Sequence, residues 1–420
     1  MFRLLIVLIS AFYLSVGFAA TPLNYGSEYQ HHSKVMQQQR RYMVSLPERY
    51  QISQLKYPTL YVIDGDFQFH HVANTARHLA RMGKIPPVIV VGVANQGPQD
   101  YLKSNTWSIE ESPEYGGIKQ FSNYIRQELI PLIDRQYRTN QSRALAGYSL
   151  GGLFVNYEYL TPDTPFDRFI AMSPSLWFDD YRLIEDYATH FKSAESKVYA
   201  PIFLSVASEK GMGVKKLVEV FKQDAPEKLQ WTFKEYPDES HFSTALPALY
   251  DGFQFLWPNF FIDVESMMAH EDYLKVFELL AEKKAGWGGA PITWLQSYTF
   301  SKYVFYSKQQ DKIPQIIESA KKQFPESANL ILLDLVLGHN RKQQFQQAEV
   351  LLNSVAGENR NNAKWHYLMS VAQKGLEKPQ KMQKYHQKAL SLAKKQQLES
   401  WEYWEMEPYL SQSITKTKAN

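Results

Sequence analysis

The sequence contains no cysteine, and this absence removes several structural options. Disulfide bonds, metal sites built on thiolates and lipid attachment at an N-terminal cysteine are all excluded. The sequence also lacks a large excess of either charge, because its 46 lysine and arginine residues nearly balance its 43 aspartate and glutamate residues. It contains no long basic block. Nucleic acid is therefore not an expected partner. With 44% hydrophobic and 21% charged residues, the chain has the composition of a globular protein held by packing.

Long apolar runs are scarce too, and the N-terminal segment is the exception. Residues 1–20 carry one positive charge at Arg3, continue through the apolar run Leu4–Val16 and end in Ala19 and Ala20. This pattern is typical of a secretory signal peptide cleaved after one of the two alanines. An uncleaved anchor helix is the alternative. We therefore expect a periplasmic or secreted protein with no stable membrane span after signal cleavage.

The 420 residues exceed one ordinary domain, and the pattern changes near Pro258. Before this point, buried-strand runs alternate with helical spacing, which predicts a mainly parallel sheet of about eight strands with helices on both faces. The predicted strands are Arg41–Pro47, Tyr57–Ile63, Val88–Val93, Arg143–Gly147, Phe169–Met172, Pro201–Ala207 and Trp231–Tyr236, and the predicted helices are Phe69–Met82, Ile118–Tyr137, Leu153–Leu160 and Leu246–Leu256.

After Pro258 the strand signals vanish and helical spacing dominates. Leu330 and Leu333 recur as Trp365 and Leu368 after the same interval, which resembles the period of tetratricopeptide repeats; an irregular helical bundle is the alternative. We expect a signal peptide at 1–20, an α/β domain at 21–260 and an α-helical, tetratricopeptide-like domain at 261–420 that recruits a protein partner or covers a site. The predicted helices here are Val264–Ala285, Trp294–Tyr306, Ile313–Phe324 and Leu330–Leu337.

The pentapeptide Gly147–Gly151 matches G-x-S-x-G, between a predicted strand and a predicted helix. A serine at such a strained turn has an exposed hydroxyl, and the two glycines allow strand and helix to approach closely. Ser149 is therefore the candidate nucleophile. A serine hydroxyl needs a base to accept its proton and a carboxylate to orient that base. His241 follows the last predicted strand, as a base in this chain order should.

Glu209 follows the preceding predicted strand and completes the order serine, acid, histidine. Asp238 and Glu239 are rivals because they are close to His241 in sequence. The backbone amide of Leu150 is one expected donor to the oxyanion, and the amide of Gly65 or Asp66 is the other.

Three aromatic residues are expected to border the substrate, although core packing would explain them equally well: Tyr148, Trp177 and Phe67. The adjacent His70 and His71 would point in different directions on a helix, so we predict no metal site from them.

Five segments carry a family resemblance: Tyr61–Asp66, Phe121–Tyr137, Arg143–Leu153, Phe169–Trp177 and Asp238–His241. In register, they resemble the putative esterase family, which groups esterase D-like proteins with ferric-siderophore esterases. The resemblance implies an α/β-hydrolase fold, cleavage of carboxylic esters, no cofactor or metal, and functional roles for Ser149 and His241. It does not imply Glu209, because the acid varies in the family. Siderophore-cleaving members tend to carry an arginine where this chain has Ala94–Asp100.

The sequence thus predicts an exported serine esterase that acts on a small-molecule ester. Two alternatives remain open at this point. The same acyl-enzyme would make the protein an acyltransferase if an alcohol replaced water as acceptor. A binding protein that works through the helical repeats would need no intact serine and histidine.

Overall fold

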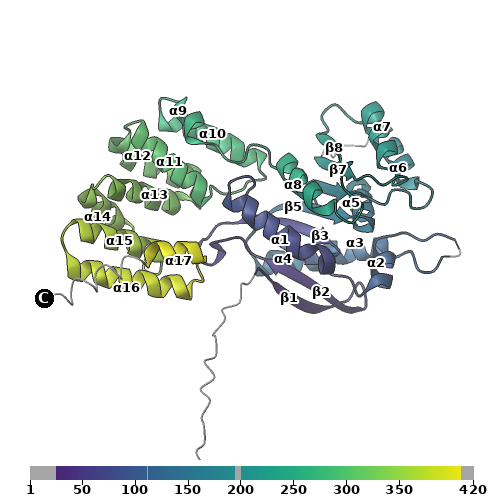
Figure 1. Cartoon of the computed structure of the whole chain (residues 1–420), viewed down its shortest axis with the longest axis horizontal. Coiled ribbons are helices and arrows are strands. Elements are labelled where there is room, and N and C mark those ends of the chain that lie inside the picture. Colours follow the sequence, from purple (N-terminus) through teal and green to yellow (C-terminus); the bar gives the residue numbers. More distant parts are fainter. Residues whose placement is uncertain (1–24, 111, 194–199, 408–420) are drawn as a thin grey trace, which may run out of the picture.

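A computed structural model describes residues 25–110, 112–193 and 200–407, so the predicted signal peptide at 1–20 lies outside the described residues. One sheet of eight strands forms the centre of the molecule, in the order β1-β2-β4-β3-β5-β6-β7-β8 (Figure 1). The first two strands run antiparallel to their neighbours, and β3 to β8 are parallel. The strands are β1 Ser27–Ser33, β2 Gln38–Ser45, β3 Tyr57–Ile63, β4 Ile89–Val93, β5 Thr139–Tyr148, β6 Arg168–Met172, β7 Ile202–Val206 and β8 Trp231–Glu235.

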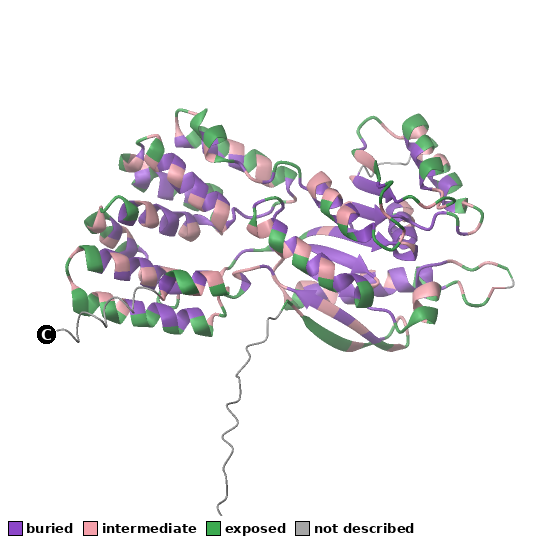
Figure 2. Ribbon diagram, in the orientation of Figure 1, coloured by how far each residue is buried: buried purple, intermediate pink, exposed green. Residues whose placement is uncertain are grey.

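Strand β1 is the strand that the sequence pattern did not predict. Most of its side chains are exposed, so it lacks the apolar alternation that marks a half-buried strand (Figure 2). It is a strand because its backbone pairs with β2 from Ser27 to Ser33. The inner strands β3 and β4 are buried along their whole length.

Alternation along the inner strands divides the core between the two faces of the sheet. Leu60 and Val62 of β3 pack on one face, whereas Tyr61 and Ile63 pack on the other. The first face is covered by α1 Gly65–Arg81 and α8 Ala245–Leu256. The second is covered by α3 Ile118–Tyr124, the π-helical turn Ile125–Leu129, α4 Ile130–Gln136, α5 Leu150–Leu160, α6 Arg182–Lys192 and α7 Val214–Asp224, and the short α2 Pro98–Ser104 packs beside α3.

The chain after α8 is helical throughout its described part, and we call residues 264–406 the helical unit. The predicted single helix Val264–Ala285 is wrong: two helices occur, because Asp272 caps a new helix and accepts a hydrogen bond from the amide of Leu274 at 2.9 Å. The helices are α9 Val264–Met268, α10 Tyr273–Gly286, α11 Trp294–Tyr306, α12 Ile313–Gln323, α13 Ala328–Arg341, α14 Phe345–Ser354, α15 Ala363–Gly375, α16 Pro379–Lys395 and α17 Ser400–Met406.

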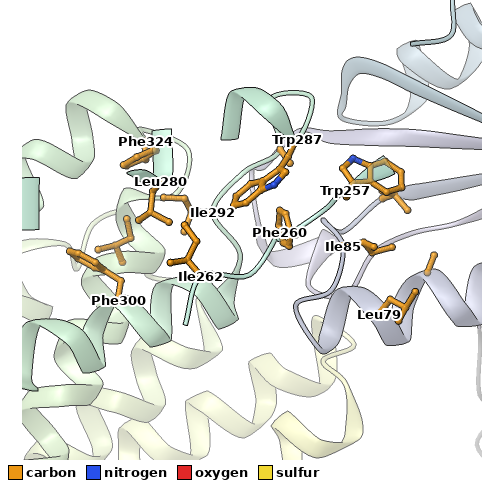
Figure 3. Packing of buried hydrophobic residues seen from close by; sticks show 14 of the residues in the cluster. Leu79, Ile85, Trp257, Phe260, Ile262, Leu280, Trp287, Ile292, Phe300 and Phe324 are labelled. Atoms are coloured by element: carbon orange, nitrogen blue, oxygen red, sulfur yellow. The ribbon is translucent and has the colours of Figure 1, made fainter. Parts of the chain in front are cut away.

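The hydrophobic core is continuous between the sheet and the helical unit. One hydrophobic cluster continues from Leu79 and Ile85 through Trp257 and Phe260 into the helices (Figure 3). At the junction, the ring centroids of Phe260 and Trp287 are 4.3 Å apart. The two parts of the chain therefore share buried apolar surface.

The far end of the helical unit also returns to the α/β part. Arg49, in the loop after β2, donates from Nε to Glu402 of α17 at 2.6 Å. Its guanidinium lies 4.9 Å from the ring centroid of Trp294 and 5.7 Å from that of Trp401. The contact places α17 against a loop more than 350 positions earlier in the chain. No helix in the described ranges is long and apolar enough to cross a membrane.

Candidate active site

Ser149 occupies the turn between β5 and α5, and its backbone is strained. Its φ of 57° and ψ of −120° are rare for a residue with a side chain. Glycine is required on both sides of this turn. A Cβ atom on Gly147 would lie 2.1 Å from the carbonyl oxygen of Gly151, and a Cβ atom on Gly152 would lie 2.9 Å from Cα of Pro174. The predicted sharp turn is thus present, with α5 starting directly after the serine.

His241 lies in the loop after β8, and both of its ring nitrogens are engaged. Nε2 is 3.0 Å from the Ser149 hydroxyl oxygen, and Nδ1 is 3.2 Å from Oε1 of Glu209. The ring packs 4.9 Å from the ring centroid of Tyr148, whose hydroxyl donates to the carbonyl oxygen of His241. The structure therefore brings together the three residues that the sequence order selected.

Glu209 follows β7 and has a lowered pKa. Burial alone would raise the pKa, but the nearby Ser173 hydroxyl, its own backbone amide and His241 favour the charged form and outweigh that effect. The carboxylate is therefore charged at neutral pH beside the imidazole. The rival Asp238 is exposed to solvent. The backbone carbonyl of Glu239 accepts hydrogen bonds from the amide and the hydroxyl of Ser208, which holds the histidine loop against the chain next to Glu209.

The three predicted oxyanion donors lie at two helix starts. Leu150 begins α5, and Gly65 and Asp66 begin α1 rather than lying in a loop. The first amides of a helix have no partner inside the helix, so these groups can serve a ligand. Gly65 is also required for packing, because a Cβ atom there would lie 2.8 Å from the backbone carbonyl carbon of Gly92.

The Asp66 side chain is already engaged by neighbouring residues, whereas its backbone amide is a candidate oxyanion donor. It pairs with the guanidinium of Arg41 and accepts a hydrogen bond from the amide of Asn95 at 2.7 Å. Its neighbour Asp64, at the end of β3, has a left-handed backbone and accepts from the Asn95 side chain at 3.1 Å. Burial, together with the charge of Asp66, raises the pKa of Asp64 to about 6 against the opposing hydrogen bond from Asn95. The sequence analysis did not single out Asp64.

Tyr101 is a second residue that the sequence analysis missed. It lies on α2, and its hydroxyl is 3.4 Å from both the carbonyl oxygen of Tyr148 and the amide nitrogen of Gly151. A tyrosine 50 positions before Gly151 carries no local signal for such a contact. The strand order brings it there, because α2 follows β4 and β4 lies two strands from β5.

The residues predicted to border a substrate differ in exposure. Phe67 is 70% exposed and Trp177 is 46% exposed, whereas Tyr148 is buried under His241. Phe242, next to His241, is 88% exposed and was not predicted. No group of three or more metal-ligating side chains occurs in the described ranges. His71 bonds to Gln68 at 2.6 Å instead.

A family model described as "Putative esterase" matches residues 33–242, half of the chain. The chain belongs to this family. The family match and the resemblance in the sequence agree, and the α/β-hydrolase fold and the activity of a carboxylic ester hydrolase are thereby established. The matched range ends directly after His241, so the helical unit lies outside it.

Two named relatives act on siderophores. The ferri-bacillibactin esterase BesA of Bacillus subtilis is 28% identical over 221 residues, which cover 46% of this chain and 76% of that protein. A siderophore enterobactin esterase of Emericella nidulans is 28% identical over 172 residues, which cover 34% of this chain and 57% of that protein.

Two solved structures are also similar to this chain. An IroE-like serine hydrolase from Shewanella oneidensis has a TM-score of 0.57 at 26% identity and covers 71% of this chain and 99% of its own. An uncharacterised protein from Capnocytophaga ochracea, at 13% identity, has a TM-score of 0.56 and covers 87% of this chain and 93% of its own. At that identity the likeness concerns the fold alone, and it extends beyond the sheet into the helical unit.

Proposed function

We propose that this esterase works through a Ser149–His241–Glu209 triad and a covalent acyl-enzyme. The observation that supports this most is the unbroken line of contacts from the serine hydroxyl to Nε2 of His241 and from Nδ1 to Glu209. In the first step, His241 takes the proton of Ser149 while the serine oxygen bonds to the ester carbonyl carbon. The resulting imidazolium is positively charged, and the ionised Glu209 stabilises it.

The second half of the cycle uses the same groups in reverse. The imidazolium gives its proton to the departing alcohol oxygen as the ester bond breaks, leaving an acyl group on Ser149. Water then attacks the acyl carbon while His241 takes its proton, and the imidazolium returns that proton to the Ser149 oxygen as the bond to the acyl group breaks and the acid leaves. Throughout, the Leu150 amide and the first amides of α1, at Gly65 and Asp66, supply hydrogen bonds to the oxyanion.

The substrate is a small ester, and the charges around the serine bear on its kind. Asp64, Asp66 and Glu209 are carboxylates at the carboxyl edge of the sheet, and the guanidinium of Arg41 is paired with Asp66 and with Glu28. The apolar Phe67, Trp177 and Phe242 are exposed at the ends of β3, β6 and β8. This combination favours uncharged esters with apolar or aromatic parts over anionic ferric catecholates.

Replacement of the two central residues tests the mechanism. Ser149→Ala and His241→Ala should each nearly abolish hydrolysis of a small activated ester, and the double variant should lose little more, because the two act as one unit. A fluorophosphonate should label wild-type Ser149, and mass spectrometry of the labelled peptide identifies the site. Robust hydrolysis by a folded Ser149→Ala variant would refute the triad.

Export to the periplasm or the medium is part of the proposal, and it rests on the pattern of residues 1–20. N-terminal sequencing of the protein from fractionated cells tests it. A mature chain that starts after Ala19 or Ala20 is expected, and an intact N-terminus in the cytoplasmic fraction would contradict it.

A further inference from the structure

Tyr101 follows a residue that an ion pair and hydrogen bonds hold in place. Its neighbour Asp100 accepts from the side chain of Arg40 at 2.7 Å and from the amide of Gln96 at 2.8 Å. The Arg40 side chain is completely buried, and its guanidinium also donates to the carbonyl oxygen of Ala94 at 2.9 Å. A buried ion pair with further hydrogen bonds restricts the start of α2 and therefore the direction of the Tyr101 side chain.

The Tyr101 hydroxyl contacts the turn that carries the nucleophile rather than a distant part of the core. It lies 3.4 Å from the carbonyl oxygen of Tyr148 and 3.4 Å from the amide nitrogen of Gly151. These two contacts lie on either side of Ser149 and Leu150 in the turn, so the hydroxyl is placed beside the amide expected to bind the oxyanion.

We propose that the Tyr101 hydroxyl donates a hydrogen bond to the oxyanion formed when Ser149 attacks the ester, next to the Leu150 amide. This inference rests on the proposed role of Ser149. The contacts of the hydroxyl are long in the free protein, since ordinary O–H···O bonds measure about 2.7–2.8 Å. The hydrogen bond from the Tyr101 hydroxyl to the Tyr148 carbonyl oxygen is therefore weak. A negatively charged oxygen is a much stronger acceptor than a peptide carbonyl.

The bond would then strengthen as charge develops, and an interaction of that kind raises kcat rather than substrate affinity. The hydroxyl also keeps its proton at working pH. Burial and the charge of Asp64 raise the pKa of Tyr101 to about 12, although hydrogen bonds from Gly151, Ser149 and Leu150 oppose the shift. Tyr101 is thus a donor and not a base.

The Tyr101→Phe substitution removes the hydroxyl and leaves the ring. We expect kcat on a small activated ester to fall by about 10- to 100-fold, with KM nearly unchanged. This loss is at or below the lower end of the range for removal of one oxyanion donor, because the Leu150 amide remains. Tyr157→Phe is the matched control, since Tyr157 is a half-buried tyrosine on α5. Its kcat should equal that of the wild type.

A trifluoromethyl ketone separates a catalytic role from a structural one. Ser149 adds to the carbonyl carbon of the ketone and forms a stable oxyanion. Tyr101→Phe should therefore lower the affinity for the ketone by the same factor as it lowers kcat/KM, while the melting temperature stays unchanged. Unchanged kcat would overturn the proposal. Reduced kcat with wild-type affinity for the ketone would also overturn it, because the hydroxyl would then only place the turn. Ser149→Ala, measured in parallel, tests the triad independently: an active Ser149→Ala variant refutes the nucleophile whatever Tyr101 does.

Discussion

The Glu209→Gln substitution tests the proposed acid of the triad, and the structure allows the expected loss of kcat to be estimated. The amide has the same shape as the carboxylate, so packing near Ser173 is retained, but the negative charge opposite the imidazolium is lost. The Glu209 oxygen is 3.2 Å from Nδ1 of His241, at the long end of the normal range, and its side chain keeps 16% of its accessible surface. Both features weaken the interaction relative to a fully buried, short contact.

Two unit charges about 4 Å apart attract each other by about 4 kcal/mol at the effective dielectric constant of about 20 that suits partly exposed protein sites. Partial solvent access lowers this figure, so about 3–4 kcal/mol is the reasonable range for the loss of imidazolium stabilisation. At about 1.4 kcal/mol for each factor of ten, kcat should fall by roughly 10²- to 10³-fold. KM for a small ester should change little, because the carboxylate acts on the base.

Steady-state kinetics on a small activated ester measures both constants, and Asp238→Asn and Glu239→Gln are the matched controls. Each removes one carboxylate charge from the histidine loop, and each should keep kcat within a few-fold of the wild type. The assignment would be wrong if Asp238→Asn were the damaging change and Glu209→Gln behaved like the wild type. That result would leave the roles of Ser149 and His241 intact.

Three further predictions concern stability and substrate choice. Because the pKa of Asp64 is raised to about 6 in the folded protein, its proton stabilises the fold fully below the unfolded pKa of about 4, and this contribution is lost as pH rises through 6. Asp64→Asn should therefore match the wild type in chemical unfolding near pH 4 and exceed it by about 1–2 kcal/mol at pH 7.5, after allowance for partial exposure; equal stabilities at pH 7.5 would contradict this. Trp287→Ala should destabilise the protein by about 3–5 kcal/mol, because Trp287 packs on Phe260 inside the shared core. Activity and helical signal should be lost in one thermal transition, and separate transitions would show that the helical unit folds independently. Uncharged aryl esters should give a higher kcat/KM than a ferric catecholate triester, and the reverse order would refute the charge argument.

The local features of this protein could be predicted from the sequence because they depend on near neighbours. Alternation of side chains marked β3, whose observed range Tyr57–Ile63 equals the predicted one, and helical spacing marked α11 at Trp294–Tyr306 in the same way. The turn at Ser149 was predictable for the same reason, since Gly147 lies against the backbone of Gly151 and allows the close local approach of strand and helix. Chain order then pointed to His241 and Glu209.

Tertiary structure decided the features that depend on residues far apart in the sequence. Tyr101 reaches Gly151 across 50 positions, and Arg49 reaches Glu402 across 353. Strand β1 could not be predicted because pairing with β2, rather than burial, makes it a strand. Sequence patterns report the periodicity of one segment, whereas these contacts are set by the order of strands and by which apolar faces pack together. The tyrosine that contacts the turn at Ser149 therefore carries no distinguishing sequence signal until the sheet is assembled.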